Sequence, residues 1–290
     1  MRPILYITDN LLPKIPQREG DLPMSTTAAC EQTCRVLLVT SAKGGVGKTT
    51  STVNLAASVA YKGQKVLLMD IDPQGNASSG LGINKRELET SSYDVIVNSL
   101  AIEKAMIKTK FENLWVLPSN MNLAGAELEL VDMQHRESKI KNAVAPIKAD
   151  FDFIFLDCPP SLGLITLNAL CAADTVLVPI QCEYYALEGL SQLMSTIRQV
   201  KRLYNPHIDM EGVLLTMYDG RLNLTQQVVG ELKRFFPKKV YATAIPRNVK
   251  LSEAPSYGLP IYYYDKNSKG AMAYDALADE FLKQNGKEVS

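Results

Sequence analysis

Short apolar runs alternate along the chain with segments in which apolar residues recur at helical spacing. The runs rich in Val, Ile and Leu predict buried strands at 35–40, 65–70, 114–117, 151–157, 175–179, 213–216 and 240–245. Helical spacing predicts helices over 51–60, ended by Gly63, over 127–147 and over 187–204. This alternation predicts an α/β fold with a mostly parallel, doubly wound sheet flanked by helices. Ligands of such sheets bind at the carboxyl ends of the strands.

The pattern begins at residue 35, and we interpret residues 35–290 as a single domain. Residues 1–34 contain four prolines, mixed charges and no periodicity, so they predict a flexible N-terminal extension. Met24 is an alternative start of translation, and the role of the extension is left open. No run reaches membrane-spanning length and no secretory signal is visible, so we expect a cytoplasmic protein.

The five cysteines are scattered and have no convincing zinc spacing. Cys158, Cys171 and Cys182 lie in or beside apolar segments, and we expect them to be small buried hydrophobic residues. Cys30 and Cys34 could instead bind a metal or form a pair.

The segment between the first strand and the first helix is rich in glycine and carries two lysines. It ends in Gly-Lys-Thr-Thr, as a phosphate-binding loop does, and its strand–loop–helix context is the one such a loop requires. Backbone N–H groups would surround the phosphates, Lys48 would reach the β- and γ-phosphates, and the Thr49 hydroxyl would bind Mg²⁺. The second lysine, Lys43, is not explained by this pattern. The nucleotide-binding residues that the pattern predicts are Gly44, Gly45, Val46, Gly47, Lys48, Thr49 and Thr50, and Lys43 joins them only through the resemblance described below.

Acidic residues follow two of the predicted strands. Asp70 and Asp72 end one strand, and two residues of separation in an extended chain point both carboxylates the same way. One would contribute to the Mg²⁺ site and the other would orient an attacking water. Asp157 ends another strand and would hold Mg²⁺ directly or through water. The candidate metal-binding residues are therefore Thr49, Asp157 and one of the two aspartates Asp70 and Asp72.

The net charge is zero, with 31 basic and 31 acidic residues, but the segment from Arg221 to Lys250 is basic. It contains seven basic residues and only Glu231 as an acid, which gives 7 − 1 = +6. Such a patch can bind DNA in a salt-dependent way. A solvated helix face and loop would have the same composition, and charge alone does not separate the two interpretations.

Together these motifs resemble the ParA/Soj chromosome or plasmid partitioning ATPases, a deviant Walker-A group that includes MinD and the nitrogenase iron protein. The resemblance covers about residues 35–285. The motif at 183–189 and the stretch 216–219 are similar to the Soj-like branch. The motifs that carry the resemblance lie at 43–50, 70–76, 157–163, 183–189 and 245–248.

The resemblance supplies roles for single residues. In relatives, the counterpart of Lys43 crosses a nucleotide-sandwich dimer and contacts the phosphates of the other subunit. The counterpart of Asp72 is needed for hydrolysis, so the catalytic residues implied are Lys43, Lys48 and Asp72. The counterpart of Asp70 supports the metal region, so the metal-binding residues implied are Thr49, Asp70 and Asp157. Pro246 and Asn248 match a loop that borders the adenine. The implied DNA contacts are Arg221 and Lys250.

The function implied is a weak ATPase that uses ATP and Mg²⁺. ATP would drive formation of a homodimer, and the dimer would bind DNA non-specifically. A ParB/Spo0J-like partner, engaging through its N-terminal tail, would stimulate hydrolysis and release. The protein would then be cytoplasmic and nucleoid-associated. No recognition helix is visible, and 34 residues leave no room for an N-terminal helix-turn-helix domain.

Three alternatives differ in testable ways. A MinD-like membrane-cycling ATPase should end in a basic amphipathic helix, whereas the last residues here are polar and include Gly286. An iron–sulfur protein would need cysteines at the cluster positions of that family, which Cys158 and Cys171 do not match. A metabolic kinase or synthetase would need a small-molecule pocket, for which no distinct residues are visible. Another regulatory member of the same group is left open as a further alternative. Hydrolysis rate, chromosomal or plasmid origin and any role in replication control are left open.

Overall fold

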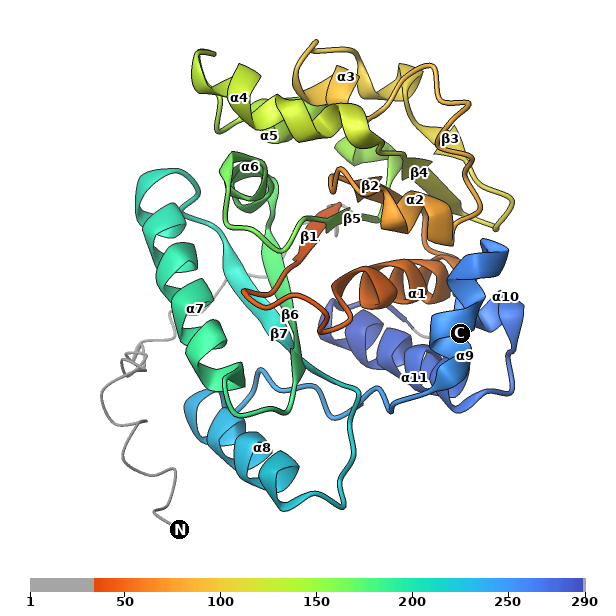
Figure 1. Ribbon diagram of the computed structural model, residues 1–290, viewed down its shortest axis with the longest axis vertical. Coiled ribbons are helices and arrows are strands. Elements are labelled where there is room, and N and C mark those ends of the chain that lie inside the picture. The colour runs from red at the N-terminus through yellow and green to blue at the C-terminus, as the bar shows by residue number, and fades with distance from the viewer. Residues whose placement is uncertain (1–33, 289–290) are drawn as a thin grey trace, which may run out of the picture.

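The structure, a computed structural model, describes residues 34–288, and within them a seven-stranded sheet forms the centre (Figure 1). The strand order is β3-β4-β2-β5-β1-β6-β7, and every pairing is parallel except that of β3 with β4. The mostly parallel sheet predicted from the sequence is confirmed. The strands are β1 Arg35–Val39, β2 Val66–Asp70, β3 Ile107–Lys108, β4 Leu114–Leu117, β5 Phe153–Asp157, β6 Thr175–Gln181 and β7 Asp209–Thr216.

Helices cover both faces of this sheet. Two longer ones, α1 and α11, lie against one face, and α5, α6 and α7 lie against the other (Figure 1). The α-helices are α1 Lys48–Tyr61, α2 Asn76–Gly80, α3 Ser92–Ile96, α4 Ala126–Val131, α5 Lys139–Val144, α6 Leu164–Ala172, α7 Ala186–Leu203, α8 Asn223–Phe235, α9 Val249–Glu253, α10 Ile261–Tyr264 and α11 Lys269–Gln284. Short 3₁₀ turns are η2 Ile102–Lys104, η3 Met121–Gly125, η4 Ala145–Asp150 and η5 Ala254–Tyr257.

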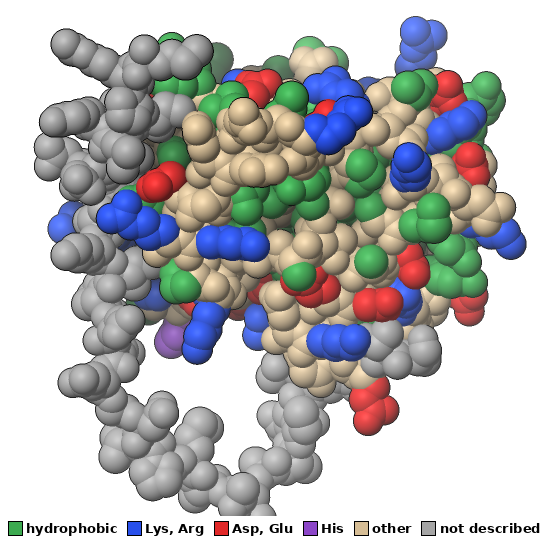
Figure 2. Space-filling view, turned by 90° about the horizontal axis from the view of Figure 1, so that it is seen from below, with side chains coloured by type: hydrophobic (Ala, Val, Ile, Leu, Met, Phe, Trp, Pro, Cys, Tyr) green, Lys and Arg blue, Asp and Glu red, His purple; other side chains and the backbone are tan. Residues whose placement is uncertain are grey.

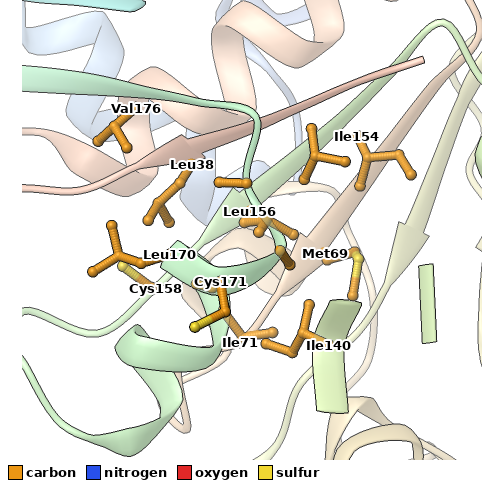
Figure 3. Packing of buried hydrophobic residues seen from close by; sticks show 14 of the residues in the cluster. Leu38, Met69, Ile71, Ile140, Ile154, Leu156, Cys158, Leu170, Cys171 and Val176 are labelled. Carbon is orange, nitrogen blue, oxygen red and sulfur yellow. The ribbon is translucent and has the colours of Figure 1, made fainter. Parts of the chain in front are cut away.

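The central strands are buried on both faces, which is why they read as continuous apolar runs. In β1, Leu37 belongs to the core shared with α1 and α11, whereas Leu38 belongs to the core on the opposite face. Figure 3 shows the second core, where Leu38 and Leu156 from the sheet lie near Leu170 and Cys171 of α6. Alternate side chains of one strand therefore fix helices on both sides of the sheet.

Two of the cysteine predictions are confirmed, because Cys158 and Cys171 are buried in this core (Figure 3). Cys182 is only partly buried. Cys34 is buried as well, whereas Cys30 and the rest of the predicted extension, residues 1–33, lie outside the described residues. Within residues 34–288, no helix combines the length and the apolar character needed to cross a bilayer.

The prediction of one helix over 127–147 is wrong. The chain forms α4, then a turn, then α5, and it continues as a 3₁₀ turn from Ala145. The backbone of His135 is left-handed, with φ of 52°, and an α-helix cannot pass through that conformation. Pro146, which lacks an N–H group, then follows at the start of the 3₁₀ turn.

The predicted strand over 240–245 is also wrong. This segment forms isolated bridges with β7 at Val240 and, beyond it, at Pro246, and the N–H of Ile245 donates to the Leu215 carbonyl, but these contacts do not join into a continuous ladder. The reason lies in α11, where the Glu280 carboxylate accepts hydrogen bonds from the backbone N–H groups of Ala242 and Thr243, at 2.7 and 2.9 Å. Backbone donors bound to a side chain cannot also form a strand ladder.

Candidate nucleotide-binding site

The glycine-rich loop leaves the carboxyl end of β1 and enters α1. Gly45 and Gly47 have φ of 75° and 84°, the left-handed region that glycine tolerates best. Gly47 is the N-cap of α1, so no side chain caps the first turn of this helix. A Cβ atom on Gly44 or Gly45 would meet nothing within 4 Å. The first N–H groups of a 14-residue helix therefore lie beside open space, an arrangement suited to a phosphate.

Lys48 is the first residue of α1 and is 8% exposed. Its ammonium has no salt-bridge partner anywhere in residues 34–288. A buried, unpaired ammonium is costly, and phosphate oxygens would supply the missing negative charge. The structure thus places Lys48 where the sequence predicted a phosphate ligand, and its contact with phosphate stays a prediction.

Asp157 and Asp70 end adjacent parallel strands and stand opposite each other in the register of β5 and β2. The Thr52 hydroxyl donates to Asp157 Oδ1 at 2.9 Å, whereas Asp157 Oδ2 is buried without a hydrogen-bond partner in the described structure. Burial, and then the charge of Asp70, raise the pKa of Asp157 well above its ordinary value, and the neighbouring hydroxyls of Thr49 and Thr52 oppose this rise.

The unpartnered oxygen of Asp157 is what a Mg²⁺ site would require. Mg²⁺ prefers carboxylate, hydroxyl and water oxygens, and Thr49 contributes a hydroxyl next to this carboxylate. The residues present therefore fit the predicted ion. A bound cation would also remove the penalty of two buried carboxylates lying close together.

Asp70 is already well hydrogen bonded. Its Oδ2 accepts from the N–H and the hydroxyl of Ser78, at 2.8 and 2.7 Å, and its Oδ1 accepts from the N–H of Asp72 at 3.2 Å. Burial raises the pKa of Asp70, and the Ser78 bonds counteract part of that rise. These contacts hold the loop after β2 against the start of α2, and any metal contact of Asp70 stays a prediction.

Asp72 lies in that loop and is 8% exposed. Its Oδ1 accepts from the N–H of Gln74 at 2.9 Å, and the next residue, Gly75, has φ of 60°. Lys85 Nζ donates to the carbonyl of Gln74 at 2.5 Å and covers the turn. The carboxylate of Asp72 is therefore fixed by a tight, glycine-dependent turn.

Lys43 is on the outside of the phosphate loop, and about half of its side chain is exposed. Its ammonium forms an ion pair with Glu183, which follows β6 and is exposed to a similar extent. A recess beside this pair is lined by Val46, Tyr185 and Gly189. In the single chain, the lysine that the sequence left unexplained is thus engaged by a carboxylate of its own chain.

The end of β7 closes the site on another side. The Thr216 hydroxyl donates to the carbonyl of Val46 at 2.8 Å, which ties β7 to the phosphate loop. Two residues later, Tyr218 bridges to Pro246. Asn248 follows and caps α9, because its side chain accepts from the N–H of Lys250 at 2.8 Å. Pro246 and Asn248 are thereby joined to the site through β7, and their contact with adenine stays a prediction.

The two residues predicted to bind DNA are both paired with acidic neighbours. Arg221 is 89% exposed, and its guanidinium donates to both carboxylate oxygens of Asp219, at 2.8 and 2.6 Å. Lys250 pairs with Glu253 at 3.1 Å. Figure 2 views the end of the molecule near α8, where Lys and Arg side chains are spread among Asp and Glu. DNA contact by these residues stays a prediction.

Sequence reasoning missed several residues of the site. Thr52 lies one helical turn after Lys48, and this i, i+4 spacing could have indicated a shared face toward β5. Ser78 and Thr216 contact Asp70 and Val46 across separations that no local pattern reveals.

Comparison with known proteins agrees with this geometry. A protein-family profile described as an AAA domain matches residues 34–210. The sporulation initiation inhibitor protein Soj of Bacillus subtilis is 54% identical over 85% of this chain and 97% of its own length. The chromosome partitioning protein ParA of Myxococcus xanthus is 51% identical over 87% and 89%. The chain belongs to the ParA/Soj family of chromosome-partitioning ATPases.

Solved structures share the fold of this ParA/Soj family member. Cobyrinic acid a,c-diamide synthase from Mycobacterium smegmatis, described with a bound ATP analogue and magnesium, is 37% identical with a TM-score of 0.76 over 87% of this chain and 96% of its own. The septum site-determining protein MinD of Pyrococcus horikoshii, complexed with Mg-ADP, is 28% identical with a TM-score of 0.70 over 87% and 98%. The phosphate loop described above is therefore that of a P-loop ATPase.

Proposed function

We propose that this ParA/Soj ATPase is an ATP-controlled switch that binds DNA as a homodimer and is released by a stimulating partner. The observation that carries the proposal is the different placement of two lysines in one phosphate loop. Lys48 is buried at the start of α1, whereas Lys43 is half exposed at the rim of the loop. A cation on the outside can reach a nucleotide bound by another subunit, and a buried one cannot.

Within one chain, different residues bind the phosphates, the metal ion, the attacking water and the adenine of ATP. The loop N–H groups and Lys48 bind the phosphates, and Thr49 and Asp157 hold Mg²⁺, with Asp70 supporting them. Magnesium, when bound, neutralises negative charge on the β- and γ-phosphates. Asp72 orients the attacking water, and Pro246 and Asn248 border the adenine. The solved relatives with an ATP analogue or Mg-ADP support ATP and Mg²⁺ as ligands.

Lys43 connects nucleotide binding to dimerisation. Its ammonium, supplied across the interface, adds a charge-assisted contact to the phosphates of the other subunit. Each bound triphosphate then stabilises the dimer more than the monomer, which shifts the population toward the dimer. To make this contact, Lys43 must leave Glu183, so the dimer forms at the expense of an ion pair within the chain.

DNA binding would follow from dimerisation. Each subunit contributes Arg221, Lys250 and the neighbouring basic residues, and two such patches on one DNA add their phosphate contacts. The contacts carry no base-specific information, so binding is non-specific and nucleoid-wide. A ParB/Spo0J-like protein would end the cycle by stimulating hydrolysis, consistent with the chromosome-partitioning names of relatives such as ParA of Myxococcus xanthus.

Co-sedimentation with DNA in ATP, ADP and no nucleotide, with the oligomeric state measured in parallel, tests the proposal. The parent should form dimers and sediment with DNA only in ATP. Lys48→Ala should lose nucleotide binding, and Asp72→Ala should dimerise and persist on DNA. A protein that remains monomeric at high concentration with a non-hydrolysable triphosphate and DNA would contradict the proposal. Liposomes in place of DNA test the MinD-like alternative in the same assay.

A further inference from the structure

The end of β7 carries a buried hydroxyl that acts on the phosphate loop. Thr216, the last residue of this strand, is 3% exposed, and its hydroxyl donates to the carbonyl of Val46 at 2.8 Å. Val46 lies between Gly45 and Gly47, whose backbones are both left-handed. Because the C=O of Val46 and the N–H of Gly47 belong to one rigid peptide plane, the hydroxyl also sets the direction of that N–H. This N–H is one of the loop groups expected to bind phosphate.

The methyl group of Thr216 borders the same part of the loop. A Cβ atom added to Gly47 would lie 3.8 Å from Thr216 Cγ2, which is an ordinary van der Waals distance. Gly47 is the N-cap of α1 and directly precedes Lys48. The side chain of Thr216 therefore lies against two successive loop residues, just before the buried lysine.

The backbone directly after Thr216 has an unusual conformation. Met217 has φ of 48°, a left-handed value that is uncommon for a residue other than glycine. The neighbouring chain holds it there, because the N–H of Tyr218 donates to the carbonyl of Ile245 at 2.9 Å. The Arg247 guanidinium also contacts Met217 Sδ, at 3.6 Å. Such strain persists only where surrounding contacts fix it, so this turn holds Thr216 in one position at the end of the strand.

A second buried threonine shows that the strand does not need such a hydrogen bond. Thr175, the first residue of β6, is 9% exposed, and its hydroxyl has no hydrogen-bond partner among the described residues. A β-branched side chain suits a strand with or without a partner for its hydroxyl. Strand formation therefore does not account for the bond between Thr216 and Val46.

We propose that Thr216 is a positioning residue for nucleotide binding, and that its hydroxyl shapes the phosphate loop before ATP binds. Thr216 does not touch the nucleotide in this mechanism and acts only through the Val46 peptide. The inference rests on the proposed function, because it concerns ATP binding at the same loop. Loss of the hydroxyl should weaken every ligand that the loop binds, since a preorganised site loses less free energy on binding. The hydrolytic step should be unchanged, because Asp157 and Asp72 come from β5 and from the loop after β2.

Four full-length proteins isolate the hydroxyl. Thr216→Val and Thr216→Ala remove it, whereas the parent and Thr216→Ser keep it, so each pair of similar size differs in this group alone. Displacement of a fluorescent ATP analogue in Mg²⁺ measures the affinity. Val and Ala should each bind ATP roughly tenfold more weakly than their hydroxyl-bearing partner, the effect of losing one buried hydrogen bond.

Thr175→Val is the matched control, because it removes a buried hydroxyl that has no partner among the described residues. It should bind ATP as the parent does. Equal affinity of the parent and Thr216→Val, equal affinity of Thr216→Ser and Thr216→Ala, or equal weakening by Thr175→Val would overturn the proposal.

Inorganic tripolyphosphate tests whether the effect lies in the phosphate loop. It carries phosphates and no adenine, so its binding does not depend on Pro246 or Asn248. Thr216→Val should weaken its competition with the fluorescent analogue by the same factor as that of ATP. A loss confined to ATP would overturn the role of Thr216 in the phosphate loop.

Hydrolysis and unfolding give readouts that separate positioning from stability. In Thr216→Val, KM for ATP should rise roughly tenfold while kcat stays within about twofold of the parent, the pattern of lost uniform binding. A lower kcat with an unchanged KM would contradict the mechanism. Urea unfolding shows which variants are folded, and if Thr216→Val is not, Thr216→Ser and Thr216→Ala decide the question.

The same samples separate this inference from the proposed function. If the parent binds ATP but neither dimerises nor binds DNA, the proposed function is wrong and the role of Thr216 is judged on ATP affinity alone. If the parent cycles on DNA and Thr216→Val binds ATP as the parent does, only the further inference is wrong.

Discussion

Asp157 illustrates how a single residue balances stability against ligand binding. One of its oxygens is buried without a donor, and the other accepts from Thr52. Such a carboxylate destabilises the empty protein, because its charged form loses hydration that nothing replaces. The same unpartnered oxygen gives the predicted Mg²⁺ a ready ligand.

We predict that Asp157→Asn stabilises the protein in the absence of Mg²⁺ and nucleotide. The native pKa of Asp157 is raised by burial, so the native state holds its proton at a pH where the unfolded chain has lost it. Stability should therefore fall as the pH rises from about 4 through the raised native pKa, and Asn removes this loss. The expected gain at pH 8 is about 1–3 kcal/mol, measured by urea unfolding at pH 5 and pH 8.

Added Mg²⁺ and ATP provide the control for this prediction. They should stabilise the parent and leave Asp157→Asn almost unchanged. A variant that is less stable than the parent at pH 8 would show that the carboxylate is better solvated than its burial indicates.

The second prediction concerns the ion pair of Lys43 with Glu183. Glu183→Gln should release Lys43 and favour the ATP-dependent dimer, provided that Lys43 acts across the interface. A half-exposed pair contributes about 0.2–1 kcal/mol, and each of the two subunits gives up one, so we expect dimerisation to strengthen by about twofold to about thirtyfold, measured by analytical ultracentrifugation with a non-hydrolysable triphosphate.

Glu188→Gln is the control. Glu188 is an exposed acid in the first turn of α7, and its substitution removes the same charge as Glu183→Gln does. Dimerisation that weakens in Glu183→Gln, and not in the control, would mean that Glu183 itself contributes to the dimer interface.

At the scale of elements, the loop after β2 shows why local backbone matters to catalysis. Gly75 has φ of 60°, and a Cβ atom there would lie 2.7 Å from the carbonyl oxygen of Ser119 and 2.5 Å from Lys85 Cδ. The backbone contact cannot be relieved by turning a side chain. This close packing fixes the turn that holds Asp72.

Gly75→Ala should therefore reduce hydrolysis strongly, by at least about tenfold, and destabilise the protein by about 1–3 kcal/mol. The slower hydrolysis and the lower stability have the same cause, because the added Cβ strains the backbone at Gly75 and displaces the turn that holds Asp72. Gly230→Ala is the matched control, because a Cβ at Gly230 in α8 meets nothing within 4 Å and should stabilise the helix by about 0.5–1 kcal/mol. ATPase rates and urea unfolding midpoints measure both effects, and unchanged hydrolysis in Gly75→Ala would contradict the role of this turn.

The elements also show what the sequence can and cannot predict. Strands buried on both faces, such as β1 and β5, were predictable because their apolar runs are continuous. The phosphate loop was predictable because its glycines and lysines are contiguous. The break between α4 and α5 depends on the left-handed backbone of His135, and any non-glycine residue adopts this conformation too rarely for the sequence to predict it. Residues 240–245 do not form a strand because Glu280 accepts hydrogen bonds from the N–H groups of Ala242 and Thr243. Glu280 lies 38 and 37 residues away from them in the sequence, and hydrophobic periodicity cannot reveal so distant a contact.

At the scale of the whole molecule, the basic segment is less free than its composition indicates. Of its seven basic residues, four have acidic partners in the folded chain. These pairs are Arg221–Asp219, Arg234–Glu231, Lys239–Asp209 and Lys250–Glu253. A neutral monomer with such a patch should hold DNA weakly, so retention depends on combining two patches in a dimer.

The last prediction tests whether the phosphate contacts of the two patches add in the dimer. In the ATP-bound dimer, Arg221→Gln should lower the slope of log affinity against log salt by about one for each lost phosphate contact, which is about two for the dimer. Asp219→Asn should raise the slope, because it frees the Arg221 guanidinium to contact a phosphate without adding a basic residue. Fluorescence anisotropy with a duplex of arbitrary sequence, at several salt concentrations, measures both. Arg86→Gln, an exposed arginine outside the basic segment, should leave the slope unchanged. If Arg221→Gln and Arg86→Gln lower the slope equally, DNA contacts are spread over the whole surface and the segment from 221 to 250 has no special role.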